Sequence, residues 1–290
     1  MSTRYDIAII GSGPAGLSAA INAKIRNKSF IVFGSKNCSN KLVKAHQINN
    51  YLGFPGKSGE ELASMFLEHT KMMGVEITDK KVTMVYPMGD YYSIMANNDI
   101  YEATSVILTT GVQASQLLPG EEELLGRGVS YCATCDGNLY KGKVVAVIGY
   151  GKEEEEEVNF LAELASKVYY IPMYKEEVDV HESVEIIKER PTEIKGSKVV
   201  EQLVLKNQEL DIDGLFILRS SIRASQLVPG LKVEENHVVV DRLMNTNLEG
   251  LYAAGDIVGK PYQYIKAAGE GNIAALSASS FVDKKKKEEV

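Results

Sequence analysis

Twice in this chain of 290 residues, a short apolar run ends in a glycine-rich turn and leads directly into a helical pattern. The first run covers residues 5–10 and is followed by GSGPAG; the second covers residues 144–148 and is followed by GYG. A short apolar run bounded by glycine is typical of a strand buried inside a parallel sheet. A strand, a glycine turn and a helix in this order open a doubly wound fold. Two such openings predict an α/β protein with two Rossmann-like three-layer domains.

The first glycine turn has the spacing that holds a dinucleotide. Gly11 allows the tight turn, Gly13 lets backbone N–H groups approach a pyrophosphate, and Gly16 lets the helix pack closely on the strand. The N-terminus of the following helix adds partial positive charge. One expected feature is missing, because the next strand ends at Phe33 and Gly34 without an acidic residue to bind a ribose hydroxyl.

A pair of cysteines lies between the two glycine turns, in the segment CATCD at 132–136. Cysteines separated by two residues close a small disulfide ring, and such pairs at the start of a helix have lowered thiol pKa values. Asp136 is next to the pair, where it can move a proton during thiol–disulfide exchange. A zinc site would need a second pair of ligands, and Cys38 and the four histidines show no such spacing. We therefore predict a redox-active dithiol, no metal, and a bystander role for Cys38.

Composition excludes several classes of function. Three cysteines, two of them in a C-x-x-C pair, argue against a secreted disulfide framework and for a reducing compartment. A net charge of −7 argues against general nucleic-acid binding. No apolar run approaches the roughly 20 residues of a membrane span, and the first residues lead into a strand without a signal-peptide pattern. We expect a cytoplasmic protein that binds neither nucleic acid nor membrane, with residues 284–287 in a frayed tail.

The order of the motifs along the chain resembles that of the low-molecular-weight thioredoxin reductases. These motifs are GSGPAG at 11–16, TTG at 109–111, CATCDG at 132–137 and GDI at 255–257. They span nearly the whole chain, and the CATCDG element is highly specific. The resemblance implies a discontinuous FAD-binding domain, residues 1–112 and 238–290, interrupted by an inserted dithiol domain, residues 113–237. It also implies a homodimer.

The resemblance further implies roles for individual residues. Cys135 would face the flavin, Cys132 would attack the disulfide of the partner, and Asp136 would act as the acid–base catalyst. Two departures lie near the expected flavin, where SNKL at 39–42 replaces Gly-Gly-Gln-Leu and Tyr262 replaces an Arg found in many members. The residues expected to bind FAD are Gly11, Ser12, Gly13, Pro14, Ala15, Gly16, Lys41, Leu42, Asn50, Thr110, Gly111, Gly255, Asp256, Gln263, Tyr264 and Ile265.

The second glycine turn departs from the family pattern. Members that use NADPH have Gly-x-Gly-x-x-Ala there and an arginine-containing cluster after the next strand, whereas this chain has GYGKEE at 149–154 and PMY at 172–174. Glu154 stands where only a small residue fits, and an unbroken acidic run at 153–157 covers the helix start, where it occupies and repels an anion site. Residues 152–189 hold 12 acidic and 4 basic residues. Like charges within a Debye length of about 8–10 Å repel, so we expect this site to reject a polyphosphate.

These features favour a flavoprotein disulfide reductase that passes electrons from reduced ferredoxin through FAD and the dithiol to thioredoxin. In this it resembles the ferredoxin-dependent flavin enzymes that lack the NADPH motifs. An acidic ferredoxin would dock on basic residues of the first domain, for which the candidates are Lys24, Arg26, Lys28, Lys36, Lys41 and Lys44. Three alternatives remain open: a flavin-dependent dithiol oxidase that uses oxygen, an NADPH-dependent thioredoxin reductase with an atypical pocket, and a flavin-binding redox sensor without turnover.

Overall fold

The computed structural model describes residues 4–97, 99–112, 117–219 and 223–288, which belong to two units. The first unit combines Met1–Gln113 with Arg223–Val290, and the second is Ala114–Ile222. The sequence predicts the return to the first domain at residue 238, whereas residues 223–237 already lie with the first unit. Their helix α6 (Ala224–Leu227) packs on β4 (Val82–Pro87), and β16 (His237–Val238) packs on η3 (Asp256–Val258).

The first unit is built on a seven-stranded sheet whose centre is parallel. Its order is β3-β2-β1-β6-β5-β4, and β17 pairs with the end of β6. The strands β1, β2, β3, β6 and β17 run parallel, and the antiparallel meander of β4 and β5 extends the sheet from β6. The remaining strands of this sheet are β1 (Tyr5–Ile10), β2 (Phe30–Phe33), β3 (Ile77–Thr78), β5 (Tyr92–Ala96), β6 (Asp99–Leu108) and β17 (Leu251–Ala253).

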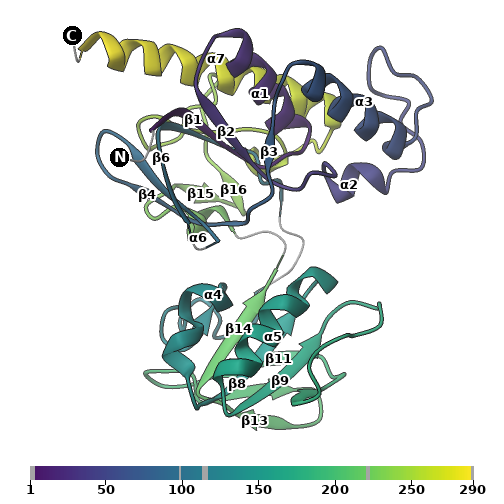
Figure 1. The fold of residues 1–290 in the computed structure, drawn as a ribbon, viewed down its shortest axis with the longest axis vertical. Coiled ribbons are helices and arrows are strands. Elements are labelled where there is room, and N and C mark those ends of the chain that lie inside the picture. Colours follow the sequence, from purple (N-terminus) through teal and green to yellow (C-terminus); the bar gives the residue numbers. More distant parts are fainter. Residues whose placement is uncertain (1–3, 98, 113–116, 220–222, 289–290) are drawn as a thin grey trace. The chain divides into compact units, whose positions relative to one another are not determined.

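Small residues bring two helices together over one side of this sheet (Figure 1). Helix α1 (Pro14–Ile25) and helix α7 (Tyr264–Glu288) meet through alanines such as Ala19 and Ala274, which are fully buried with the strand side chains. A Cβ atom at Gly271 of α7 would lie 2.0 Å from the carbonyl oxygen of Ala15, so only glycine permits this approach. Helix α3 (Gly59–Met72) packs beside α1 and starts with a capping box, and the short α2 (Asn40–Val43) contacts α3.

The C-terminal lysines extend α7 and bind the rest of the first unit. The ammonium group of Lys286 lies 2.6 Å from the carboxylate of Asp6, and that of Lys285 lies 3.3 Å from Glu249. Burial raises the pKa of Asp6, but the hydrogen bond from Lys286 and other donors lower it below its ordinary value. The predicted frayed tail is therefore wrong for residues 284–287, which continue the helix to Glu288.

The second unit has the three layers that its glycine turn predicts. A five-stranded parallel sheet has the order β10-β9-β8-β14-β7; alternate residues of β8 point to opposite cores. One core lies against the antiparallel sheet β11-β12-β13, and the other lies against the helices α4 (Ala133–Asp136) and α5 (Glu155–Leu164). The strands are β7 (Val129–Ser130), β8 (Val144–Gly149), β9 (Lys167–Pro172), β10 (Val184–Ile186), β11 (Pro191–Lys195), β12 (Gln202–Leu205), β13 (Glu209–Asp211) and β14 (Gly214–Leu218).

The contact between α1 and α7 can be tested with two glycines of the same helix. We expect Gly271→Ala to force α7 away from Ala15 and to lower the free energy of unfolding by about 1–3 kcal/mol. Gly269→Ala is the matched control, because a Cβ there meets nothing within 4 Å and alanine stabilises a helix interior by about 0.5–1 kcal/mol. Urea unfolding measures both, and equal stabilities for the two variants would contradict the packing described.

Candidate functional site

Three loops of the first unit meet at one edge of its sheet. Because β1, β6 and β17 are parallel neighbours, their carboxyl ends lie at the same edge, which is where open α/β sheets bind ligands. The loops that follow are 11–16, 109–111 and 255–256, so the structure brings these sequence-predicted residues together. Thr109 links two of the loops, because its hydroxyl donates to the carbonyls of Ile10 (2.9 Å) and Gly11 (3.0 Å).

The first glycine turn is shaped to accept a pyrophosphate. Gly11 has a φ of +119°, and a Cβ there would lie 2.4 Å from the carbonyl oxygen of Thr109; a Cβ at Gly16 would lie 1.8 Å from the carbonyl oxygen of Gly11. Gly13 is the N-cap of α1, and a Cβ there would meet only Ser39, at 3.7 Å. The first turn of α1 holds no carboxylate. The N-terminus of α1 therefore keeps its positive end open to an anion, and the turn fits the pyrophosphate of FAD.

The loop after β17 is fastened to the start of α7 by a pair of opposite charges. The Lys266 ammonium donates to the carbonyls of Gly255 (3.2 Å) and Gly259 (2.8 Å), and the Glu270 carboxylate accepts the N–H of Gly255 at 3.0 Å. Asp256 starts the η3 turn in this loop. The sequence analysis does not identify Lys266 and Glu270. Opposite charges four residues apart at the start of a helix nevertheless indicate an ion pair on one helix face.

Other residues predicted to bind FAD lie beside these loops. The Asn50 side-chain amide donates to the Gln263 side-chain oxygen at 2.5 Å, which joins two segments far apart in the sequence. Leu42 is fully buried, whereas Ile265 is 40% exposed. Burial, followed by the charge of Asp256, raises the pKa of Tyr264. The remaining predicted residues are Ser12, Pro14, Ala15, Thr110 and Gly111, which lie in the loops described above, and Lys41, whose side chain lies outside the described part of the structure.

Tyr262, one of the departures from the family pattern, pairs with a histidine. Its hydroxyl lies 2.7 Å from Nε2 of His237, and the two rings are tilted with centroids 6.0 Å apart. Both residues belong to the first unit and Tyr262 is 42% exposed. The tyrosine is therefore held in place next to Gln263.

The second glycine turn is filled by the protein's own side chains. A Cβ at Gly149 would lie 2.5 Å from the hydroxyl of Tyr170, whose ring is fully buried against the turn. Tyr170 donates to the hydroxyl of Tyr174 at 3.0 Å, and Tyr174 donates to the carboxylate of Glu155. Glu154 and Glu155 are buried at the start of α5 (Glu155–Leu164), which follows a 3₁₀ turn. Carboxylates of the chain itself therefore stand at this helix start, where a dinucleotide would place its phosphates.

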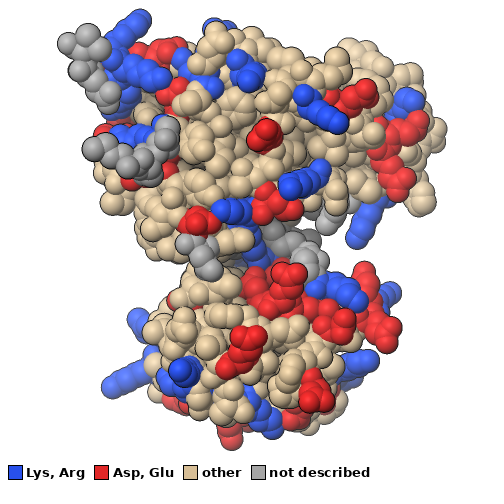
Figure 2. Space-filling view, in the orientation of Figure 1, with Lys and Arg blue, Asp and Glu red and all other residues tan. Residues whose placement is uncertain are grey.

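A buried ion pair lies at the carboxyl ends of the strands in the second parallel sheet, beside the glycine turn. Arg219 directly follows β14, and its guanidinium binds both carboxylate oxygens of Glu121, with one contact at 3.0 Å. The ring of Tyr150, in the glycine turn, lies 5.0 Å from the guanidinium carbon. Burial raises the pKa of Glu121, but the hydrogen bond from Arg219 and its other donors bring it below its ordinary value. Acidic side chains gather on the second unit at the end where β14 stops (Figures 1 and 2). This turn does not fit a nicotinamide dinucleotide.

The dithiol is closed as a disulfide between Cys132 and Cys135 at the start of α4 (Ala133–Asp136). Cys132 is the N-cap residue, and its Sγ accepts the N–H of Cys135 at 3.2 Å. Cys132 is 9% exposed, whereas Cys135 is exposed. The hydroxyl of Ser130 donates to the Asp136 carboxylate at 2.6 Å and accepts the N–H of Cys132 at 3.2 Å, so Ser130 ties the acid to the dithiol. Sequence reasoning missed Ser130.

Cys38 lies apart from this chemistry, in the first unit. It is 2% exposed and packs with Leu17, Leu42 and Leu62. Burial raises the pKa of its thiol, which disfavours the reactive thiolate.

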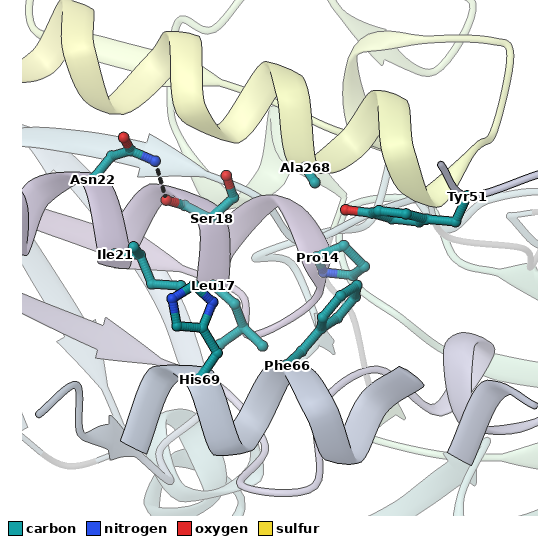
Figure 3. Close-up of a pocket in the computed structure, with 9 residues that line it drawn as sticks. All are labelled: Pro14, Leu17, Ser18, Ile21, Asn22, Tyr51, Phe66, His69 and Ala268. Carbon is teal, nitrogen blue, oxygen red and sulfur yellow. Dashed lines mark hydrogen bonds between the residues drawn. The ribbon is translucent and has the colours of Figure 1, made fainter. Parts of the chain in front are cut away.

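A separate cavity of about 220 Å³ lies among α1, α3 and α7 (Figure 3). Its walls combine apolar side chains such as Leu17, Ile21 and Phe66 with polar ones such as Ser18, Asn22 and His69. Substrate pockets usually measure about 300–1,000 Å³, so this cavity is small for one.

Among the helices of the described residues, none is both long enough and apolar enough to cross a membrane. The cytoplasmic location stays a prediction.

Comparisons with known proteins agree with this geometry. The pyridine nucleotide-disulphide oxidoreductase family matches residues 5–271. The thioredoxin reductase of Bacillus subtilis (strain 168) is 32% identical over 300 residues, which cover 96% of this chain and 95% of the relative. Among solved structures, a thioredoxin reductase from Gloeobacter violaceus is similar with a TM-score of 0.82 and 30% identity, covering 98% of this chain and 95% of the other.

A second solved structure is more similar. It is the crystal structure of a ferredoxin-flavin thioredoxin reductase from Clostridium acetobutylicum, with a TM-score of 0.92 and 57% identity. The match covers 98% of this chain and 99% of that chain.

Proposed function

Because the chain belongs to the pyridine nucleotide-disulphide oxidoreductase family, and within it to the thioredoxin reductases, we propose that it reduces the disulfide of thioredoxin with electrons from ferredoxin. It is an oxidoreductase that acts on a disulfide and uses FAD. The contrast between the two glycine turns supports the choice of donor: the helix after the first turn starts without a carboxylate, whereas the helix after the second starts with Glu155, Glu156 and Glu157. The similar structure from Clostridium acetobutylicum, named for ferredoxin and flavin, supports the same choice.

The residues of the first unit hold FAD in this proposal. The N-terminus of α1 at Gly13 would bind the pyrophosphate, Asp256 would bind the ribityl or pyrophosphate side, and Gln263, which accepts a hydrogen bond from Asn50, would contact the isoalloxazine ring. Lys266 and Glu270 hold the loop that carries Asp256. When bound, FAD supplies the electron pair that opens the Cys132–Cys135 disulfide.

The residues of the second unit perform the thiol chemistry. Exposure alone favours Cys135 as the attacking thiol, but the N–H that Cys132 Sγ accepts stabilises a thiolate on Cys132, and only a thiolate attacks. Cys132 gives its proton to Asp136, attacks one sulfur of the partner disulfide and forms a mixed disulfide. The other sulfur leaves as a thiolate, to which Asp136 passes the proton. Cys135 then attacks Cys132, re-forms the internal disulfide and releases the second thiol of the partner.

The energetics permit this direction of flow. Ferredoxins of the plant type have potentials near about −400 mV and thioredoxin has a potential near about −270 mV, so two electrons release roughly 6 kcal/mol.

The balance of charged residues also differs between the two units. The first holds 20 Lys and Arg against 18 Asp and Glu, and the second holds 12 against 21, so an acidic ferredoxin is attracted to the first. Lys28 contributes little to such a surface, because its ammonium is paired with Asp283.

The choice of electron donor is tested with the FAD-loaded enzyme under anaerobic conditions. Oxidised thioredoxin is supplied together with one donor at a time: an acidic bacterial ferredoxin kept reduced, NADPH, or NADH. We expect reduced ferredoxin to yield two thioredoxin thiols for every two ferredoxins oxidised, at a rate that falls as salt is added. Both nicotinamide cofactors should be slower by about a hundredfold or more, because the acidic second turn repels their phosphates. Equal rates with NADPH would contradict the proposal, and so would oxygen consumption driven by dithiothreitol in a separate assay in air.

The assignment of the attacking thiol is tested by trapping. A thioredoxin with a single reactive cysteine, carried as its mixed disulfide with thionitrobenzoate, is offered to two variants. Cys135→Ser keeps the Cys132 thiolate, so we expect it to release thionitrobenzoate and to form a covalent complex with thioredoxin. Cys132→Ser should form the complex at least about tenfold more slowly, because its remaining thiol lacks the stabilising N–H. Mass spectrometry counts the complex, and the reverse order of the two variants would assign the attack to Cys135.

We further propose that two copies form a homodimer through the side that α1 and α3 share. Exposed apolar side chains stand there at Ile25 (59%), Met65 (38%) and Met72 (79%), and the last two share a face of α3. Light scattering should give the mass of two chains, and Met72→Asp should shift it toward one. Met88→Asp, at a methionine that is 51% exposed after β4, is the control that should leave the mass unchanged. A native mass of one chain, 31.8 kDa, would refute the dimer.

A further inference from the structure

The acidic run at the start of α5 reaches the dithiol as well as the glycine turn. Glu157, in the first turn of α5, accepts the backbone N–H of Ala133 at 3.0 Å through its Oε2 atom. Ala133 directly follows Cys132 and is the first residue of α4. A carboxylate from a different helix thus accepts a hydrogen bond from the peptide N–H next to Cys132. The Cys132 Sγ in turn accepts the N–H of Cys135, which would stabilise a thiolate there.

The position of this carboxylate affects the stability of the Cys132 thiolate. The N–H groups at a helix start stabilise an anion, and here Glu157 takes one of them while Cys132 Sγ takes another. A carboxylate in this place also repels a thiolate on the neighbouring residue. Both effects make the thiolate less stable than it would be beside a neutral side chain. A less stable thiolate makes a dithiol a stronger reductant and each thiolate a stronger nucleophile.

We propose that Glu157 is a positioning residue of the dithiol: it fixes the start of α4 through Ala133 and, by its charge, makes the reduced pair give up its electrons more readily. This rests on the proposed function only in that the dithiol has a partner disulfide to reduce. It explains why a carboxylate is useful at this place even though no nucleotide binds beside it. The acidic run then serves two sites, with Glu154 and Glu155 at the glycine turn and Glu157 at the dithiol.

Charged and titratable groups of the described residues reach α4 from three elements. From α4 itself, Asp136 faces Ser130, and from α5, Glu157 faces Ala133. From the 3₁₀ turn η1 (Gly137–Tyr140), which packs on both helices, comes Tyr140. Burial and then the charge of Asp136 raise the pKa of the Tyr140 phenol, so it stays neutral at neutral and mildly alkaline pH.

The test measures how far dithiothreitol reduces the Cys132–Cys135 disulfide at equilibrium. Two electrons and two protons pass from dithiothreitol to the enzyme disulfide, and the thiols of the FAD-loaded enzyme are then trapped and counted by mass spectrometry. Glu157→Gln keeps an oxygen that can accept the N–H of Ala133 and removes only the charge. We expect the equilibrium to move toward the dithiol by about tenfold, or about 30 mV, at about pH 9, where the Cys132 thiolate is formed. The shift should shrink at about pH 6, where the thiol is protonated.

Controls separate charge from structure and from the electron donor. Glu156→Gln removes the same charge from an exposed neighbour in the same helix, and it should move the equilibrium less than about twofold. Glu157→Ala removes both the charge and the acceptor, so it should shift the equilibrium at least as far as Glu157→Gln. An unchanged equilibrium in Glu157→Gln, or an equal shift at both pH values, would overturn the proposal. Because neither ferredoxin nor thioredoxin is present, failure here leaves the proposed function standing.

Discussion

The electrostatics of a helix start determine what each half of this protein can do. Both halves place a glycine turn between a central parallel strand and a helix, and in such a fold the N–H groups of the helix start form a site for an anion. In the first unit the turn at Gly13 leaves that site open. In the second unit carboxylates of the chain itself occupy the first turn of α5, and Tyr170 fills the space beside Gly149. One geometry thus gives a cofactor site in one half and a closed structural element in the other.

The second unit, whose own carboxylates occupy its helix start, carries the thiol chemistry. The disulfide stands at the start of α4, where Cys132 Sγ accepts an N–H, and Ser130 links Asp136 to the same turn. Packing of α4 on α5 brings the carboxylate of Glu157 to the start of α4. The loss of a nucleotide site and the arrangement of the dithiol are therefore consequences of the same helix. Electrons have to come from a donor that needs no nucleotide pocket, which is why a small redox protein suits the structure.

Much of the fold and site could be predicted from sequence, and the misses have physical reasons. The glycine turns, the dithiol and the unusual second turn are local patterns, and each of them implies its structure directly. Glu121 could not be found in this way, because its partner Arg219 is distant in the sequence and is brought near only by the fold. Ser130 lies close to Asp136 in the sequence, but a lone serine before the cysteine pair carries no signal of its own. The expectation of a frayed tail was wrong. It followed from the charges of the lysines alone, whereas Asp6, which is distant in the sequence, forms an ion pair with Lys286 in the folded chain.

If the two helix starts differ as described, one chain holds one dinucleotide, at the first turn and not at the second. Calorimetry measures this, with FAD titrated into the apoprotein and NADPH titrated into the oxidised, FAD-loaded protein. We expect one FAD to bind per chain with a Kd below about 1 μM, and NADPH to give no binding isotherm up to about 1 mM. One NADPH bound per chain with a micromolar Kd would contradict it.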